Sequence, residues 1–139
     1  MVYEILDYIK TCPYLSNCNF NIDFLGKNPY SLSICGRAKS ETVRKYTDGD
    51  SLVMRKFPIR IRLPFGVDME KNRKNSQLCE NISRWFEENS KKGHLPDLGD
   101  ENIAVSASFE FSSQDASYSA DTAVFTASLA VLYYKTKSL

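Results

Sequence analysis

The sequence predicts an α+β fold in which two helices pack on a mostly antiparallel sheet, in the order α–β–β–β–α–β–β. Two segments carry apolar residues at the three- and four-residue spacing of a helix, and five carry them at every second position, as strands do. The chain has 139 residues, about the length of one domain, and neither a repeat nor a linker divides it. We therefore expect residues 1–139 to form a single domain.

One helix and two strands are expected at the start of the chain. Val2–Thr11 carries an apolar stripe at helical spacing, and Pro13 ends this helix. Asn19–Leu25 and Tyr30–Cys35 both alternate apolar and polar residues, and the turn-forming residues Gly26–Pro29 separate them. We predict that these two strands form a β-hairpin.

A longer strand, Ser51–Leu63, is expected after a polar segment that ends in the turn sequence Asp48-Gly49-Asp50. One face of this strand is predicted to be apolar and the other basic, with Val53, Phe57, Ile59, Ile61 and Leu63 opposite Lys56, Arg60 and Arg62. Pro58 has no N–H to give to a neighbouring strand. We therefore expect the strand to lie at an edge of the sheet or to be bulged at Pro58.

The second half of the chain is expected to contribute one helix and two strands. The apolar stripe of the helix, within Asn75–Asn89, consists of Leu78, Ile82, Trp85 and Phe86. A loop follows, and Ile103–Phe111 then alternates as a strand does. Ser112–Asp121 is a polar connection to the final strand, Thr122–Tyr134.

The final strand is long and apolar on both faces. Thirteen extended residues span roughly 43 Å, whereas a compact domain of this length is only about 35–40 Å across, so the strand must bend or project. Helices on both faces of the sheet would explain the apolar character, and so would a neighbouring subunit; we favour self-association. Tyr133 and Tyr134 lie on opposite faces, so we expect at least one of them to be exposed or at an interface.

Composition excludes several classes of protein. Eighteen basic and seventeen acidic residues leave a formal charge of +1, which argues against a dedicated binder of polyanions. No apolar run approaches the roughly 20 residues that cross a bilayer, and the acidic start of the chain is not that of a signal peptide. We therefore expect no membrane partner.

Catalytic and metal-binding motifs are scarce. The four cysteines, Cys12, Cys18, Cys35 and Cys79, form no CxxC pair, and we expect them to be reduced thiols. The single histidine, His94, lies in a loop after the second helix and has no nucleophile as its neighbour in the sequence. Phosphate-binding glycine motifs are absent from the sequence. We predict no catalytic residue, no metal, no cofactor and no enzymatic activity.

Basic residues gather in the middle of the chain. Residues 37–74 contain eleven Lys/Arg and five Asp/Glu, a local charge of +6, so the remainder carries −5. The basic face of the long strand could contact nucleic acid, be solvated, or meet the acidic part of a neighbouring copy. We favour the subunit interface, and we assign to it Lys56, Arg60, Arg62, Tyr133 and Tyr134.

Several short segments resemble a family of small proteins encoded in the head-to-tail gene region of tailed phages and prophages of Gram-positive bacteria. In chain order they are Tyr8-Ile9-Lys10-Thr11-Cys12-Pro13 with Leu25-Gly26, Val43-Arg44-Lys45-Tyr46-Thr47-Asp48-Gly49, Trp85-Phe86-Glu87-Glu88-Asn89, Gly93-His94-Leu95-Pro96-Asp97-Leu98-Gly99, and Asp121-Thr122-Ala123 leading to Leu132-Tyr133-Tyr134. Together they span nearly the whole chain. The stretch Ser106–Ala120 departs from the family in being richer in serine and alanine.

The resemblance implies a minor capsid or tail terminator-type protein, which caps the tail tube and joins it to the head. Such proteins are α+β folds that assemble as rings, commonly hexamers. The implied partners are further copies of the chain and the tail-tube and head-completion proteins, with no membrane and no specific nucleic acid. The implied location is the virion, after assembly in the cytoplasm of the bacterial host. The alternative is a small nucleic-acid- or ligand-binding module of bacterial origin.

Overall fold

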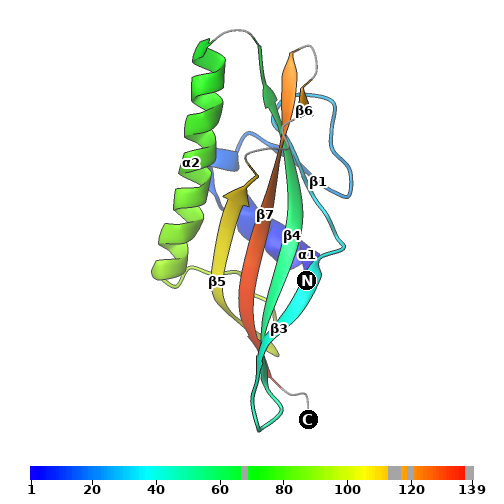
Figure 1. The fold of residues 1–139 in the computed structure, drawn as a ribbon, viewed down its shortest axis with the longest axis vertical. Coiled ribbons are helices and arrows are strands. Elements are labelled where there is room, and N and C mark those ends of the chain that lie inside the picture. Colours follow the sequence, from blue (N-terminus) through cyan, green and yellow to red (C-terminus); the bar gives the residue numbers. More distant parts are fainter. Residues whose placement is uncertain (67–68, 113–116, 119–120, 137–139) are drawn as a thin grey trace.

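The computed structural model describes residues 1–66, 69–112, 117–118 and 121–136, and these ranges contain two α-helices and a mixed sheet of seven strands (Figure 1). The elements are α1 (Val2–Lys10), the 3-10 helix η1 (Pro13–Leu15), β1 (Asn19–Ile22), β2 (Ser31–Ile34), β3 (Lys39–Lys45), β4 (Ser51–Pro64), α2 (Met69–Lys91), β5 (Asn102–Phe111), β6 (Ser117–Tyr118) and β7 (Thr122–Lys135). The predicted α+β class and mostly antiparallel sheet are confirmed.

Two long antiparallel strands, β4 and β7, form the centre of the sheet. Their register runs without a shift from Ser51 opposite Lys135 to Pro64 opposite Thr122. The strand order is β1-β2-β4-β7-β5, with β3 paired to the other half of β4 and β6 paired to the start of β7. Figure 1 shows the lower ends of β4 and β7 extending with β3 beyond the end of α2. The final strand is therefore as long as predicted, and it projects.

The two faces of the sheet differ in their covering. Along β4, the residues from Phe57 to Leu63 alternate strictly, with the odd-numbered side chains buried and Pro58 and Arg60 exposed. α1 lies behind the sheet in Figure 1, and its residues Ile5 and Ile9 are buried in the same core as the odd-numbered side chains of β4. We call the opposite face, which carries Pro58 and Arg60, the outer face. In the described part of the chain no helix covers it, so helices on both faces, the explanation of the apolar final strand that we did not favour, are not found.

An aromatic cluster joins both helices to the sheet. The ring of Phe86 on α2 stacks on that of Phe109 on β5, with centroids 5.1 Å apart. Tyr8 of α1 meets Phe86 edge-on at 5.6 Å, and its hydroxyl donates a hydrogen bond to the carbonyl oxygen of His94 at 2.9 Å. Burial of these rings removes large apolar areas from water, which explains why the amphipathic helices dock where they do.

The first two strands do not form the predicted hairpin. β1 and β2 pair in parallel, from Asn19 opposite Ser31 to Ile22 opposite Ile34. The chain leaves β1 through Asp23, which has a left-handed φ of 60°, and the side chain of Asp23 accepts a hydrogen bond from the N–H of Gly36 at 2.8 Å. The residues between Asp23 and Tyr30 run back to the level at which β1 begins, so β2 starts there and runs in the same direction as β1. The hairpin prediction is therefore wrong.

Pro58 lies neither at the edge of the sheet nor in a bulge. β4 has neighbours on both sides, and its register with β7 passes through Pro58 opposite Ser128 unchanged. The N–H of Cys35 donates to the carbonyl oxygen of Pro58 at 2.8 Å, so the proline backbone faces the segment between the end of β2 and the start of β3. The missing N–H falls in this gap between two successive partners. A central strand tolerates it for that reason.

Other elements are longer or more numerous than predicted. α2 begins at Met69, six residues before the predicted start at Asn75. The sequence pattern did not indicate this first part of the helix, because residues 70–74 are polar and carry no apolar stripe. β3 lies in the segment expected to be an irregular polar connection, and β6 lies in the predicted connection Ser112–Asp121. Residues 113–116 and 119–120 of that connection lie outside the described residues.

Candidate interaction surface

The basic residues predicted from the sequence share the outer face of β4. Lys56 and Arg60 are exposed, whereas Arg62 is half-buried. The Nε of Arg62 donates to the carbonyl oxygen of Gly26 at 2.9 Å, and its Nη1 donates to the hydroxyl of Thr122 at 3.0 Å. Arg62 therefore holds the loop after β1, while Lys56 and Arg60 present their charges to solvent.

A hollow of about 490 Å³ lies beside these arginines. Its lining consists of Asp23, Phe24, Leu25, Arg60, Arg62, Val124 and Thr126. The Phe24 side chain is 61% exposed, and the hydroxyl of Thr126 is buried without a hydrogen-bond partner among the described residues. The hollow thus places an exposed aromatic ring, two guanidinium groups and one carboxylate around a single space.

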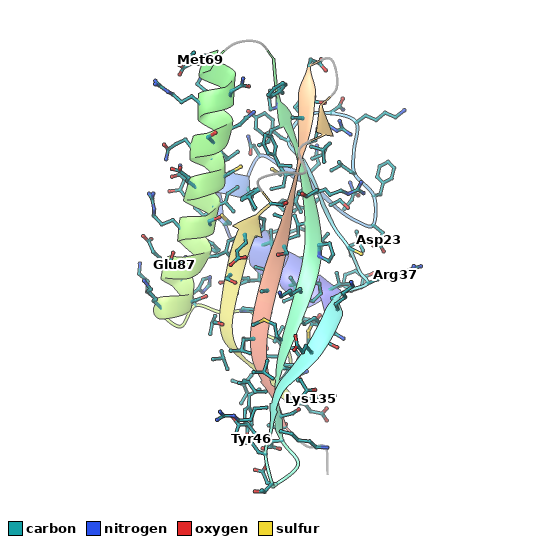
Figure 2. The ribbon with its side chains drawn as sticks, viewed as in Figure 1. Asp23, Arg37, Tyr46, Met69, Glu87 and Lys135 are labelled. Carbon is teal, nitrogen blue, oxygen red and sulfur yellow. The ribbon has the colours of Figure 1, made fainter. Side chains whose placement is uncertain are left out.

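Short contacts fix the loop that walls this hollow. The N–H of Tyr30 donates to the carbonyl oxygen of Arg62 at 2.6 Å, and the hydroxyl of Ser31 donates to the carbonyl oxygen of Asn28 at 2.8 Å. A Cβ at Gly26 would stand 2.7 Å from the Ser31 hydroxyl, so a larger residue there would displace this hydroxyl from its hydrogen bond to Asn28. Figure 2 shows Asp23, at the start of the loop, to the right of the sheet and Glu87 of α2 to its left.

The other half of the outer face is apolar. Leu52 and Met54 of β4 are half-buried and lie opposite Tyr134 and Leu132 of β7. On β5, the neighbouring side chain of Ile103 is 57% exposed. Basic and apolar areas are therefore continuous along one uncovered sheet face.

The two tyrosines assigned to the interface have different environments. Tyr133 is only 5% exposed and belongs to the core, which removes it from the surface. Tyr134 is half-buried on the outer face, where its hydroxyl donates to the carboxylate of Asp50 at 2.8 Å and its ring packs on Tyr46 at 5.6 Å. This hydrogen bond raises the pKa of Tyr134 to about 12. The structure thus brings Lys56, Arg60, Arg62 and Tyr134 onto one face.

Phe24 was not predicted as a surface residue. Its spacing from Phe20 and Ile22 suggested that it continued the apolar face of the first strand. The strand ends at Ile22, and the positive φ of Asp23 redirects the chain, so Phe24 points away from the core. A positive φ at an aspartate has no clear signature in a single sequence.

The thiols and the histidine form no reactive constellation among the described residues. All four cysteines are free, and burial raises the pKa values of Cys12, Cys18 and Cys79 to about 11. The ring of His94 packs against Tyr8 and Trp85. In the same ranges, no group of three His, Cys, Asp or Glu residues is placed to hold a metal ion.

Comparison with models of protein families and with curated proteins finds no match for this chain. Among the described residues, no helix is both long enough and apolar enough to span a membrane.

Proposed function

We propose that this protein is a non-enzymatic structural protein of a tailed phage or prophage, which works by self-association into a ring as a minor capsid or tail terminator-type protein. The observation that carries the proposal is the outer face of the sheet. Within the described residues no helix covers this face, and it combines the basic residues Lys56 and Arg60 with the apolar residues Leu52, Met54 and Ile103.

A second copy would stabilise such a face in two ways. Burial of apolar surface contributes about 2.5 kcal/mol for every 100 Å² removed from water, and contiguous exposed apolar surface is typical of interaction sites. The cations would attract acidic groups of the neighbour, and exposed acids lie elsewhere on the molecule, at Glu87, Glu88, Asp97, Asp100 and Glu101. Two different complementary surfaces on one chain favour head-to-tail assembly, which gives a ring when the rotation between successive copies closes and a filament when it does not.

The phage role rests on the resemblance of ordered sequence segments, from Tyr8–Pro13 to Leu132–Tyr134, to the head-to-tail family. Two general features of the structure agree with this role: an α+β fold and a long pair of strands, β4 and β7, that projects beyond α2. Ring formation around a tube end requires a surface that faces the neighbouring copy on each side, and the outer face with its basic half supplies one such surface.

Purified protein tests the proposal by light scattering and negative-stain electron microscopy over micromolar to millimolar concentrations. We expect rings, and we expect Arg60→Glu to shift the population toward monomer while the circular dichroism spectrum is unchanged. Lys92→Glu makes the same charge change at another exposed residue and should leave assembly intact. A wild-type protein that stays monomeric at every concentration and is absent from purified particles would contradict the proposal.

One observation favours a second function, the binding of single-stranded nucleic acid. The exposed ring of Phe24 stands beside Arg60 and Arg62 in the hollow, and stacking on an aromatic ring next to cations is how many proteins hold unpaired bases. In this case, Phe24→Ala should weaken binding of a fluorescent oligonucleotide about 5- to 150-fold. The affinity should also fall steeply with salt. Ring assembly that is unaffected by Phe24→Ala, together with no oligonucleotide binding, would exclude this second function.

A further inference from the structure

The described sheet ends in several strands that have a neighbour on one side only, and two of them, β3 and β5, lie on opposite sides of its centre. β5 pairs only with β7, and β3 pairs only with β4, so the central pair β4–β7 separates them. An open edge presents unpaired backbone N–H and C=O groups, which are a template for a further strand. Both edges belong to the same chain, so one copy can offer one edge to the other edge of the next.

On β5, alternate residues direct their backbone groups away from β7. The N–H of Ser112 donates to the carbonyl oxygen of Thr126, so between Ser106 and Phe111 the even-numbered residues face β7 and the odd-numbered residues face the edge. At Ala107 the edge is already satisfied, because the Ser90 hydroxyl donates to the Ala107 carbonyl at 2.7 Å and accepts from its N–H at 2.9 Å. At Phe109 no described group makes the corresponding hydrogen bonds to the backbone N–H and C=O that face the edge.

The Phe109 edge opens into a groove between β5 and α2. The groove has a volume of about 690 Å³, and its lining includes Ser83, Glu87 and Ser90 of α2 together with Ser106–Phe111 of β5. Glu87, labelled in Figure 2, and Glu110 bring negative charge to it, and Lys91 pairs with Glu87 at 3.4 Å. The groove is therefore a strand edge with carboxylates beside it.

The β3 edge is open along its whole length. All seven residues of Lys39–Lys45 are exposed, and three of them, Lys39, Arg44 and Lys45, are basic against the single acid Glu41. The N–H of Cys35 donates to the Pro58 carbonyl, so the even-numbered residues of β4 face β3, and their partners Lys39 and Glu41 face back. The backbone groups of Ser40 therefore point to the open edge.

We propose that Lys39–Glu41, the start of β3, pairs in one copy antiparallel with Ser108–Glu110 of β5 in the next, with Ser40 opposite Phe109. Beyond Glu41 the two strands diverge, because Ser90 already occupies the edge at Ala107. This inference deepens the proposed self-assembly and rests on it. In this register Lys39 lies opposite Glu110, an attractive pair across strands. The register shifted by two residues would place Glu41 opposite Glu110, and like charges there are unfavourable.

The topology agrees with a ring of such contacts. Within one copy β3 runs antiparallel to β4, and β5 runs parallel to β4 because both are antiparallel to β7. Copies related by rotation about an axis along the strands therefore meet with β3 antiparallel to β5. Lys39 and Glu110 both lie on the outer face, opposite Lys56 and Ser128 of their own sheets, so the outer faces of successive copies are on the same side.

A charge exchange tests the contact. Lys39→Glu and Glu110→Lys should each raise the dissociation constant of the assembly about fivefold per contact in sedimentation velocity, and the double variant should restore it. Asp7→Lys and Lys92→Glu make the same charge changes at exposed positions outside the groove lining, and they should leave the constant unchanged.

A crosslink tests the register. The proposed pairing sets Glu41 opposite Ser108, so the variant with Glu41→Cys and Ser108→Cys should form ladders of covalent oligomers when copper phenanthroline oxidises the thiols. Each single variant and the wild-type chain should form no ladder. Rings that persist without a ladder and without an effect of the charge reversals would overturn the edge pairing and leave self-assembly intact. A monomer under all conditions would overturn both.

Discussion

At the scale of the residue, Asp23 determines the path of the chain after β1. Its φ of 60° is a conformation that costs most side chains roughly 1–2 kcal/mol, and Asn and Asp adopt it most readily. Its carboxylate accepts the hydrogen bond from Gly36, which ties the end of β1 to the end of β2. One aspartate thus permits both the parallel pairing and the hollow that the following loop forms.

Substitution of Asp23 tests how much its side chain contributes to the stability of this turn. Asp23→Ala should lower the free energy of unfolding by about 2 kcal/mol, because it loses the hydrogen bond and strains the backbone. Asp23→Asn keeps an accepting oxygen and the tolerance for positive φ, so its unfolding in urea should resemble that of the wild type. Equal stability of the alanine variant would show that the turn does not depend on this side chain.

The buried thiols make stability depend on pH. Burial raises the pKa values of Cys12 and Cys18 from 9.0 to about 11, so the folded chain holds these protons more tightly than the unfolded chain. Their contribution to stability is therefore complete below pH 9 and is lost as the pH rises toward 11. Urea unfolding at pH 8 and pH 10.5 should show this decline.

Two alanine variants identify the source of the decline. Cys12→Ala removes one enclosed thiol, so the difference in unfolding free energy between the two pH values should shrink. Cys35→Ala, at a half-buried position outside the core, is the matched control and should retain the full difference. An unchanged decline in the Cys12 variant would assign the pH dependence to other groups.

At the scale of the element, Phe86 links α2 to the rest of the fold. Its ring is fully buried between Phe109 of β5 and Tyr8 of α1. Phe86→Ala should cost about 3–5 kcal/mol, because it opens a cavity where three elements meet. Tyr3→Ala removes a 70% exposed ring from α1 and should change the urea midpoint little. A small effect at Phe86 would mean that the cluster can collapse around the missing ring.

Elements with strong periodicity could be predicted, and those without it could not. Most of β4 alternates over enough residues to define its faces, β7 is recognised by its long run of apolar residues, and the stripe containing Ile82 and Phe86 locates the buried half of α2. β3 escapes prediction because all its residues are exposed, so no face of it is apolar. The relation of β1 to β2 depends on the loop between them, and its composition suits a tight turn equally well.

The same difference applies to the candidate surface. Lys56, Arg60 and Arg62 were placed on one face because alternate residues of a strand share a face. Tyr133 and Tyr134 were placed on opposite faces for the same reason, but periodicity alone does not say which face is covered. Phe24 joins the arginines only through the fold of the loop. A surface built from one strand is predictable, whereas one built across a loop is not.

At the scale of the whole molecule, both proposals make stability depend on concentration. Assembly consumes only folded copies, so it stabilises the fold by mass action, and the thermal midpoint should rise as the protein concentration increases. High salt should reduce this rise, because the proposed contacts pair exposed charges that salt screens. Arg60→Glu should reduce the slope to the part that the edge contact contributes, while Lys92→Glu should keep the wild-type slope.

Differential scanning calorimetry from micromolar to millimolar protein measures this slope directly. A slope that salt does not reduce would indicate that the apolar half of the outer face, with Leu52 and Met54, drives association without the charges. A flat wild-type midpoint would mean that the folded chain gains nothing from its copies. In that case the long strands and their uncovered face would serve a different partner, and single-stranded nucleic acid beside Phe24 is then the first to test.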